Sequence, residues 1–266
     1  MNNHPNLKIK ECNPKSRYCL VAFSSNGEGI ENKFEFENIC ESRRVKNFYH
    51  KIIFVKDPSR SFYINGIDSE INDVPKIISL IKAITNGLTI RTIGYSSGGY
   101  MALLTSLFLP NIDRVIAPGG VINLLDWHGA YCDYNFSDNK VVNDASQSQR
   151  HYFNLTPMLN NTNANVFLFY AGKAKSDKLI VEGITSHINH KYHVTIFNTN
   201  KHGYYCNASD YKYLLTFSFE KLNEVSIKNC NKTISPITYS INIQGIFRFT
   251  LNNIIRICRR IKRKIL

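Results

Sequence analysis

A serine flanked by glycines, in residues 94–99 (GYSSGG), narrows the possible folds of this 266-residue chain more than any other feature. An apolar, β-rich segment precedes it at residues 88–93, and an apolar segment of helical character follows at 100–109. Between two such elements the serine occupies a tight strand-to-helix turn that pushes its hydroxyl out of the sheet. The sequence therefore predicts a nucleophile elbow at Ser96, with a plain Gly/Ser turn as the alternative.

The rest of the chain also alternates between strand and helix patterns. Strands are expected at residues 18–24, 51–56, 88–93, 113–117, 166–170 and 192–197. Helices are expected at residues 73–84, 100–109, 177–187 and 207–222. This order predicts the α/β class, with a mainly parallel sheet that carries helices on both faces. Active sites in such sheets lie at the carboxyl ends of the strands.

One main domain is expected over residues 15–225, because α/β sheets of this size are common as single domains. Residues 1–14 are assigned to an N-terminal extension, and residues 226–266 to a linker with a basic tail. The apolar periodicity weakens over residues 121–163, which are polar and aromatic. This stretch is predicted to be a lid-like insertion, and an ordinary excursion of the chain is the alternative.

A serine hydroxyl is a poor nucleophile unless a base accepts its proton and a third group orients that base. Asp177 follows the expected strand 166–170, so it is the candidate acid, with a simple helix N-cap as the alternative. His202 stands in the loop after the last expected strand, so it is the candidate base. The predicted catalytic group is Ser96, Asp177 and His202.

An oxyanion at such a serine is stabilised by backbone N–H donors. Ser97 follows the nucleophile, so its N–H is the first candidate donor. The second is expected from the loop after an early strand, residues 23–29 (FSSNGEG), where Ser24 and Ser25 are the candidates. A simple glycine turn is the alternative interpretation of that loop.

With these residues in place, residues 15–225 resemble the α/β-hydrolase superfamily, in which serine, acid and histidine follow one another in this order. The resemblance implies acyl transfer through an acyl-Ser96 intermediate that needs no metal or redox cofactor. A narrower resemblance rests on residues 57–66 (DPSRSFYING). They are similar to a D-x(n)-[WF]-Y-x-x-G segment of hydrolase-like proteins found with bacterial surface-polysaccharide genes, some of which are capsular polysaccharide O-acetyltransferases. Phe62 replaces their more usual tryptophan.

These features predict a serine esterase or O-acyltransferase whose substrate is an ester, a thioester or a polysaccharide, with acetyl groups of surface polysaccharide as the expected context. Acetyl-CoA is one candidate acyl donor. Lys173, Lys175 and Lys201 could meet its phosphates or an anionic polymer, and solvated surface lysines are the alternative. A plain carboxylesterase and a non-catalytic interaction protein on a hydrolase scaffold stay open. No nucleic-acid partner is expected, because no recognised binding module is present.

About half of the net charge of +13 lies near the C-terminus, where residues 248–264 hold seven basic and no acidic side chains. Apolar residues between 247 and 265 recur at spacings of three and four, which is typical of an amphipathic helix. A basic helix of this kind is predicted to bind an anionic membrane surface. Packing on the body of the protein and docking to a partner are the alternatives.

Residues 1–10 are polar and no apolar run reaches 18 residues, so neither a secretory signal nor a membrane span is expected. The seven cysteines are scattered singly, which is typical of a reducing cytoplasm. A cytoplasmic location is therefore expected, with peripheral attachment to the inner face of the membrane through the tail. His187, His190 and His193 have a spacing that metal sites use, but no carboxylate set accompanies them and no metal is expected.

Overall fold

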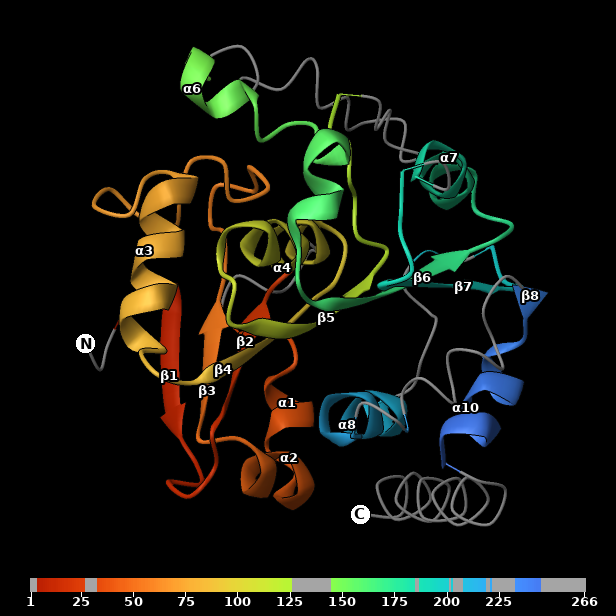
Figure 1. Ribbon diagram of the computed structural model, residues 1–266, viewed down its shortest axis with the longest axis horizontal. Coiled ribbons are helices and arrows are strands. Elements are labelled where there is room, and N and C mark those ends of the chain that lie inside the picture. The colour runs from red at the N-terminus through yellow and green to blue at the C-terminus, as the bar shows by residue number, and fades with distance from the viewer. Residues whose placement is uncertain are drawn as a thin grey trace, which may run out of the picture.

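The computed structural model describes residues 4–26, 33–125, 145–184, 187–200, 202, 208–218, 221 and 233–244. Within these residues, eight strands form one sheet in the order β1-β3-β2-β4-β5-β6-β7-β8 (Figure 1). The strands are β1 (Leu7–Glu11), β2 (Tyr18–Phe23), β3 (Lys51–Val55), β4 (Thr89–Gly94), β5 (Ile112–Pro118), β6 (Asn165–Ala171), β7 (Tyr192–Phe197) and β8 (Thr233–Ile234). All neighbouring strands are parallel except β1 and β3, which confirms the predicted α/β class.

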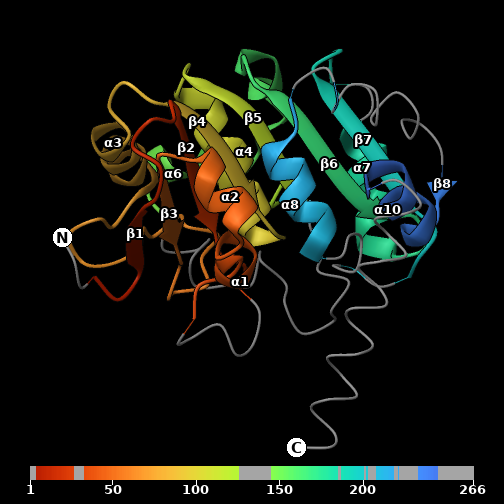
Figure 2. The ribbon, with the colours of Figure 1, turned by 90° about the horizontal axis from the view of Figure 1, so that it is seen from below.

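Helices cover both faces of this sheet (Figures 1 and 2). One face carries α3 (Val74–Ile84), α4 (Ser97–Phe108) and α7 (Lys175–Ile184), together with the short α6 (Gln147–Arg150) and the 3-10 helix η2 (Thr156–Asn161). The opposite face carries α1 (Glu37–Cys40), α2 (Arg43–Phe48), α8 (Ala208–Thr216) and α10 (Pro236–Gln244).

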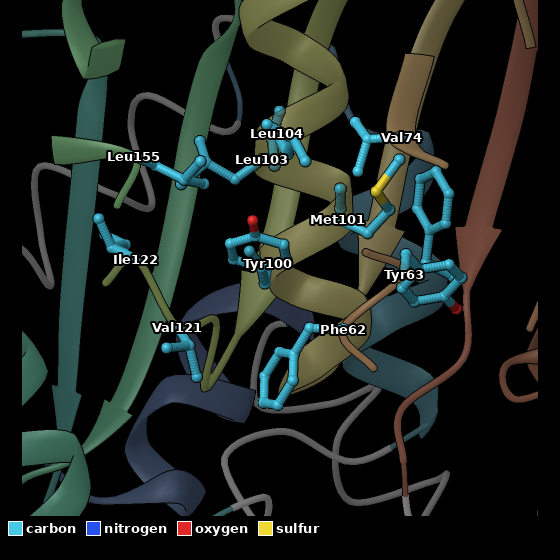
Figure 3. Close-up of a cluster of buried hydrophobic side chains, with 14 of the residues drawn as sticks. Phe62, Tyr63, Val74, Tyr100, Met101, Leu103, Leu104, Val121, Ile122 and Leu155 are labelled. Carbon is cyan, nitrogen blue, oxygen red and sulfur yellow. The ribbon is translucent and has the colours of Figure 1, made fainter. Parts of the chain in front are cut away.

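The side chains of β2 alternate between the two faces and enter two separate buried clusters. Val21 and Phe23 join the cluster under α3 and α4, whereas Leu20 and Ala22 join the cluster under α2 and α8. Figure 3 shows the first cluster, where residues of α4 pack against two later segments of the chain: Tyr100, Met101, Leu103, Leu104, Val121, Ile122 and Leu155. Because α4 is buried on most sides, the turn at its N-terminus is held firmly in place.

The strand order reverses between β2 and β4, since β3 lies on one side of β2 and β4 on the other. Phe23, the last residue of β2, pairs with Gly94, the last residue of β4. The loops that leave these two carboxyl ends therefore start side by side. Open α/β sheets bind their ligands at such a switch point, so the fold places the candidate site there.

Helix α8 is shorter than the helix expected over residues 207–222. Two buried arginines from the sheet reach its C-terminal end: Arg91 donates to the Leu215 carbonyl at 3.2 Å, and Arg114 to the Phe217 carbonyl at 3.0 Å. Carbonyls at a helix end lack partners within the helix, so these donors favour a helix end at this position. Apolar spacing in the sequence does not reveal such a cap.

Two segments expected outside the main domain take part in the sheet. Leu7–Glu11, within the expected extension of residues 1–14, pair antiparallel with β3. Within residues 226–266, β8 pairs with β7, and Tyr239 and Ile243 of α10 are buried against the core. The folded unit therefore begins earlier and ends later than expected. Both strands are short, at five and two residues, and carry little apolar signal of their own.

The expected lid over residues 121–163 is described only at its two ends, and residues 126–144 lie outside the described part of the chain. The two ends hold each other through backbone hydrogen bonds, from Leu124 N–H to the Phe153 carbonyl at 2.7 Å and from Leu155 N–H to the Ile122 carbonyl at 2.9 Å. These ends belong to the core. The lid stays a prediction for the residues between them.

Residues 245–266, which carry the expected basic helix, also lie outside the described residues. In the described ranges, no helix combines the length and the apolar character needed to cross a bilayer. Cys12, Cys19 and Cys40 are free thiols. Burial raises the pKa of Cys19 and of Cys40 to about 12, so both thiols pack as small apolar side chains.

Candidate active site

Ser96 occupies the sharp turn between β4 and α4 that the sequence predicts. Its backbone has φ 52° and ψ −113°, a conformation that non-glycine residues rarely adopt. Two backbone hydrogen bonds hold the turn: Ser96 N–H donates to the Pro118 carbonyl at 3.0 Å, and Tyr100 N–H donates to the Ser96 carbonyl at 3.0 Å. The Ser96 residue is half-buried, so part of it remains accessible at the carboxyl end of the sheet.

The glycines around Ser96 are required by close backbone packing. A Cβ atom on Gly98 would lie 2.3 Å from the Phe23 carbonyl oxygen and 2.9 Å from that of Ser24. A Cβ atom on Gly94 would lie 2.0 Å from the Gly98 carbonyl oxygen. The end of β4, the first turn of α4 and the loop after β2 therefore touch through backbone atoms, which only glycine allows.

Asp177 lies in the first turn of α7, directly after β6, and is fully buried. Its Oδ2 accepts the Ala171 N–H at 2.7 Å, and its Oδ1 accepts the Ser176 hydroxyl at 3.2 Å. A buried carboxylate needs partners of this kind, because an unpaired charge in the interior is costly. The contacts fix the orientation of the carboxylate at the carboxyl end of the sheet.

His202 contacts Asp177, as the sequence order predicts. Its Nδ1 lies 2.5 Å from Asp177 Oδ1, and the two side chains are 9% and 0% exposed. The ring of Tyr95, the residue before Ser96, lies 5.3 Å from the imidazole ring between centroids, which places His202 beside the elbow. Because Nδ1 contacts the acid, a base at this position would act through Nε2.

The structure therefore joins the acid to the histidine and places the histidine next to the elbow. It does not join the histidine to the serine, because the Ser96 hydroxyl makes no hydrogen bond in the described part of the chain. Catalytic hydrogen bonds are often long in unliganded enzymes and shorten when substrate binds, so the three positions remain compatible with a triad.

Two amides are predicted as the second oxyanion donor, and the N–H groups of both already donate hydrogen bonds to acceptors within the protein. Ser24 N–H donates to the Val55 carbonyl at 2.9 Å, which extends the ladder between β2 and β3. Ser25 N–H donates to Glu35 Oε2 at 2.7 Å. This corrects the expectation for Ser24 and Ser25, because an amide already committed to an internal acceptor does not point at a substrate.

Two other amides near the elbow are unoccupied. In the described residues, neither the Ser97 N–H nor the Asn26 N–H donates to a protein acceptor. Ser97 is the predicted donor, at the N-terminus of α4. Asn26 lies one residue beyond the predicted pair and becomes a candidate donor only in the folded chain, because the length of the β2 ladder decides which amide lacks an acceptor.

The segment of residues 57–66 forms a loop that supports the end of β2. The buried Asp57 carboxylate accepts the N–H groups of Ser59, Ser61 and Tyr63 at 3.0, 2.6 and 2.8 Å. The Tyr63 hydroxyl lies 2.7 Å from the Ser24 carbonyl, to which it donates. Burial raises the pKa of Asp57, and the hydrogen bonds from the loop oppose that rise. The residues of the sequence motif thus have a structural role behind the candidate oxyanion loop.

Backbone strain marks the same loop. Arg60, Phe62 and Tyr63 have φ of 54°, 57° and 66°, in the left-handed region that favours glycine. Such strain persists only where surrounding contacts impose it, and it is concentrated near functional sites. The Phe62 ring packs edge-on against Tyr100 of α4, with 5.9 Å between ring centroids, so the aromatic position of the motif helps to hold the loop.

No group of three or more His, Cys, Asp or Glu residues suited to a metal ion occurs in the described ranges. His193 stacks on Phe167, with 4.7 Å between ring centroids and 15° between planes. Burial lowers the pKa of His193, which favours its neutral form. Packing on the sheet therefore explains the position of His193, without a role as a metal ligand.

Among known proteins, no protein-family model and no curated protein matches the sequence. Solved structures do match. FphF, a fluorophosphonate-binding serine hydrolase of Staphylococcus aureus, aligns with a TM-score of 0.56 and 13% identity over 80% of this chain and 91% of its own. The capsule O-acetyltransferase of Neisseria meningitidis serogroup A aligns with a TM-score of 0.52 and 17% identity over 71% and 81%.

MenH of S. aureus aligns with a TM-score of 0.51 and 15% identity over 80% of this chain and 96% of its own. The chain has the α/β-hydrolase fold. At identities of 13% to 17% these similarities establish the fold, while activity must be argued from the site. In this chain the candidate nucleophile Ser96 follows β4, and the candidate acid Asp177 and histidine His202 follow β6 and β7, in the order serine, acid, histidine that is typical of this fold.

Proposed function

We propose that this protein is a serine acyl-ester enzyme, an esterase or O-acyltransferase, that works through an acyl-Ser96 intermediate. The observation that carries the proposal is the hydrogen bond between His202 and the buried Asp177, formed beside the strained turn at Ser96. A buried acid that orients an imidazole next to an accessible serine is the arrangement that nucleophilic acyl transfer requires.

In the first step, the Ser96 hydroxyl oxygen attacks the carbonyl carbon of an ester or thioester while His202 Nε2 accepts the hydroxyl proton. Asp177 holds the imidazole in place and stabilises its protonated form. The N–H groups of Ser97 and Asn26 stabilise the oxyanion of the tetrahedral intermediate. The bond to the leaving alcohol or thiol then breaks, and His202 returns the proton to that group.

In the second step, water or a sugar hydroxyl attacks the acyl-serine carbonyl. His202 removes the proton of the attacking group, the bond between Ser96 and the acyl group breaks, and the proton returns to the Ser96 oxygen. Water as acceptor gives an esterase, and a sugar hydroxyl gives an O-acyltransferase. Every residue in this scheme serves both reactions, so the acceptor distinguishes them.

Transfer of acetyl groups to a surface polysaccharide is the context we propose for this chemistry. It is supported by the motif at residues 57–66 and by the fold shared with a capsule O-acetyltransferase. Lys173 and Lys175 are exposed next to Asp177, where they could meet the phosphates of acetyl-CoA or an anionic polymer. A plain carboxylesterase is the alternative within the same chemistry, and a non-catalytic scaffold is the alternative outside it.

The test is release of free coenzyme A thiol from acetyl-CoA by purified protein, with and without capsular or cell-wall polysaccharide. An acetyltransferase should release thiol faster with polysaccharide and leave acetyl groups on the polymer. Hydrolysis of p-nitrophenyl acetate with no dependence on polysaccharide would favour the carboxylesterase. Wild-type protein that is inactive in both assays and unlabelled by a fluorophosphonate would favour the scaffold.

We further propose that the basic tail holds the protein at an anionic membrane surface on the cytoplasmic side. The proposal rests on the charge and apolar spacing of residues 245–266. Co-sedimentation with vesicles rich in phosphatidylglycerol compares the full chain with a chain that ends at Gln244, the last residue of α10. Equal partitioning of the two proteins would contradict it.

A further inference from the structure

Glu35 is a carboxylate close to the elbow that the proposed chemistry does not use. It lies in the turn before α1 and makes two reciprocal contacts with the loop after β2. Glu35 Oε2 accepts the Ser25 N–H at 2.7 Å, and Glu35 N–H donates to the Ser24 hydroxyl at 3.1 Å. One residue thus holds both the amide of Ser25 and the side chain of Ser24.

This contact lies beside the first turn of α4, the helix that begins directly after the nucleophile position. The Ser24 carbonyl oxygen would be 2.9 Å from a Cβ atom on Gly98, which is two residues after Ser96. Ser25 follows Ser24, and the unoccupied Asn26 N–H comes next in the chain. A rotation of the Ser25 backbone would therefore move the Asn26 N–H, because the two amides are separated by only two soft dihedral angles.

The loop is held on its other side by residues of the 57–66 segment. The Tyr63 hydroxyl donates to the Ser24 carbonyl at 2.7 Å, and Asn26 Nδ2 donates to the Arg60 carbonyl at 3.1 Å. These contacts hold the residues before and after Ser25 and leave its own amide to Glu35. Glu35 therefore supplies the contact that completes the support of the loop.

We propose that Glu35 is a positioning residue for the oxyanion site, which holds the Ser25 amide so that the adjacent Asn26 N–H faces the carbonyl under attack at Ser96. This role rests on the proposed function. It needs an acceptor at the Glu35 position and does not need a negative charge. Burial raises the pKa of Glu35, and the hydrogen bond from Ser25 opposes that rise. A neutral glutamine of the same length can accept the same N–H.

The experiment compares Glu35→Ala, Glu35→Gln and Glu35→Asp with wild type and with Glu37→Ala as a matched control. Glu37 is two residues away, and its carboxylate pairs with Lys8 on the surface. The measured quantities are kcat and KM for p-nitrophenyl acetate, the rate of fluorophosphonate labelling, the thermal midpoint, and amide hydrogen exchange of residues 24–26.

Loss of one oxyanion donor lowers kcat by about 10²–10³-fold, so a misplaced donor in Glu35→Ala should lower kcat by roughly 10–100-fold with little change in KM. Glu35→Gln should stay within about threefold of wild type, because it restores the acceptor. Glu35→Asp keeps a carboxylate on a side chain that is one methylene shorter, so its kcat should lie between those of Glu35→Ala and Glu35→Gln. It replaces the alanine variant in the comparison if that variant does not fold. Hydrogen exchange of the Ser25 amide should rise most in Glu35→Ala, less in Glu35→Asp, and not in Glu35→Gln.

Three outcomes would overturn this role and leave the triad standing. The first is turnover in a folded Glu35→Ala or Glu35→Asp protein that equals the wild-type value, and the second is faster turnover, which would mean that the carboxylate blocks the site. Equal losses in Glu35→Ala and Glu35→Gln would also overturn it, because the charge would then be the active property. Absence of wild-type turnover, or its survival in Ser96→Ala, would instead overturn the proposed function.

Discussion

Acidic side chains organise the two halves of the candidate site in different ways. On the β6–β7 side, Asp177 accepts the Ala171 N–H and also contacts the side chain of His202, the group that we propose moves protons. On the β2 side, Asp57 and Glu35 contact backbone N–H groups, and the groups that would bind an oxyanion are themselves backbone amides. One half is built from two side chains, and the other from a loop that several side chains hold in shape.

This difference predicts a ranking of mutational effects. The acid–base half has no substitute for its members, so one substitution there should remove most of the activity. The oxyanion half spreads its support over several contacts, so loss of one should cost less. We therefore expect the loss of activity to be largest at Ser96 and Asp177 and smaller at Gly98, and the opposite order would contradict this difference between the two halves.

Ser96→Ala removes the nucleophile that both halves serve, so kcat for p-nitrophenyl acetate should fall by about 10⁴-fold or more. Ser106→Ala is the matched control, because Ser106 lies on the same helix and its hydroxyl donates to the Leu103 carbonyl at 2.7 Å, far from the elbow in sequence. The control should lose some thermal stability and keep its kcat. Comparable turnover in both variants would exclude Ser96 as the nucleophile.

Asp177→Asn should lower kcat by about 10³–10⁴-fold, because an amide favours the wrong imidazole tautomer while keeping the shape of the acid. Asp210→Asn is a second buried acid variant for comparison. Asp210 accepts from the Ser240 hydroxyl at 2.6 Å and from Gln244 Nε2 at 2.5 Å, which ties α10 to α8. Thermal unfolding and steady-state kinetics should distinguish the two variants. Asp210→Asn should have a lower thermal midpoint, and Asp177→Asn should have a lower kcat. Similar kcat values for the two would contradict the role of Asp177.

Gly98→Ala should lower kcat by about 10–100-fold and stability by about 1–3 kcal/mol, because its Cβ atom would press on the Phe23 and Ser24 carbonyls and displace the oxyanion loop. Gly183→Ala is the control. Gly183 is exposed on α7 with nothing within 4 Å of an added Cβ atom, so alanine there should raise stability by about 0.5–1 kcal/mol. Denaturant unfolding and kinetics measure both variants, and unchanged kcat in Gly98→Ala would refute close packing at the elbow.

The smallest effect concerns the pH dependence of stability. Burial raises the folded-state pKa of Glu35 above the ordinary glutamate value of 4.5, so the unfolded chain releases this proton first as the pH rises. Wild type should therefore lose stability relative to Glu35→Gln as the pH rises from about 4.5 through the folded-state pKa, and the difference should then level off. Denaturant unfolding of both proteins between pH 4 and 7 gives the difference. A wild type that gains stability relative to Glu35→Gln over that range would contradict the burial of this acid.

Much of the fold could be predicted from the sequence, because the spacing of apolar residues indicates which side of an element is buried. The buried strands around Val21, Ile53, Ile93 and Phe167 form where continuous apolar runs indicate them. The edge strands β1 and β8 could not be found in this way, since they are short and their place depends on pairing with β3 and β7. The early end of α8 depends on Arg91 and Arg114, which come from distant strands.

The same division applies to the site. Ser96, Asp177 and His202 could be selected because each is a reactive side chain at the end of a predicted strand. The candidate donor at Asn26 could not, because the hydrogen bonds from Ser24 N–H to Val55 and from Ser25 N–H to Glu35 decide which amide stays without an acceptor in the described residues. The chemistry of a side chain follows from the residue type, whereas the folded chain around a backbone N–H decides whether that N–H has an acceptor.

The most direct measurement is the intact mass of the protein after rapid mixing with p-nitrophenyl acetate and acid quenching, for wild type and Ser96→Ala. We expect one acetyl adduct on wild type, located on the peptide that contains Ser96, and none on Ser96→Ala. An adduct of equal yield on Ser96→Ala, or turnover of the ester by that variant at the wild-type rate, would contradict acyl transfer through Ser96.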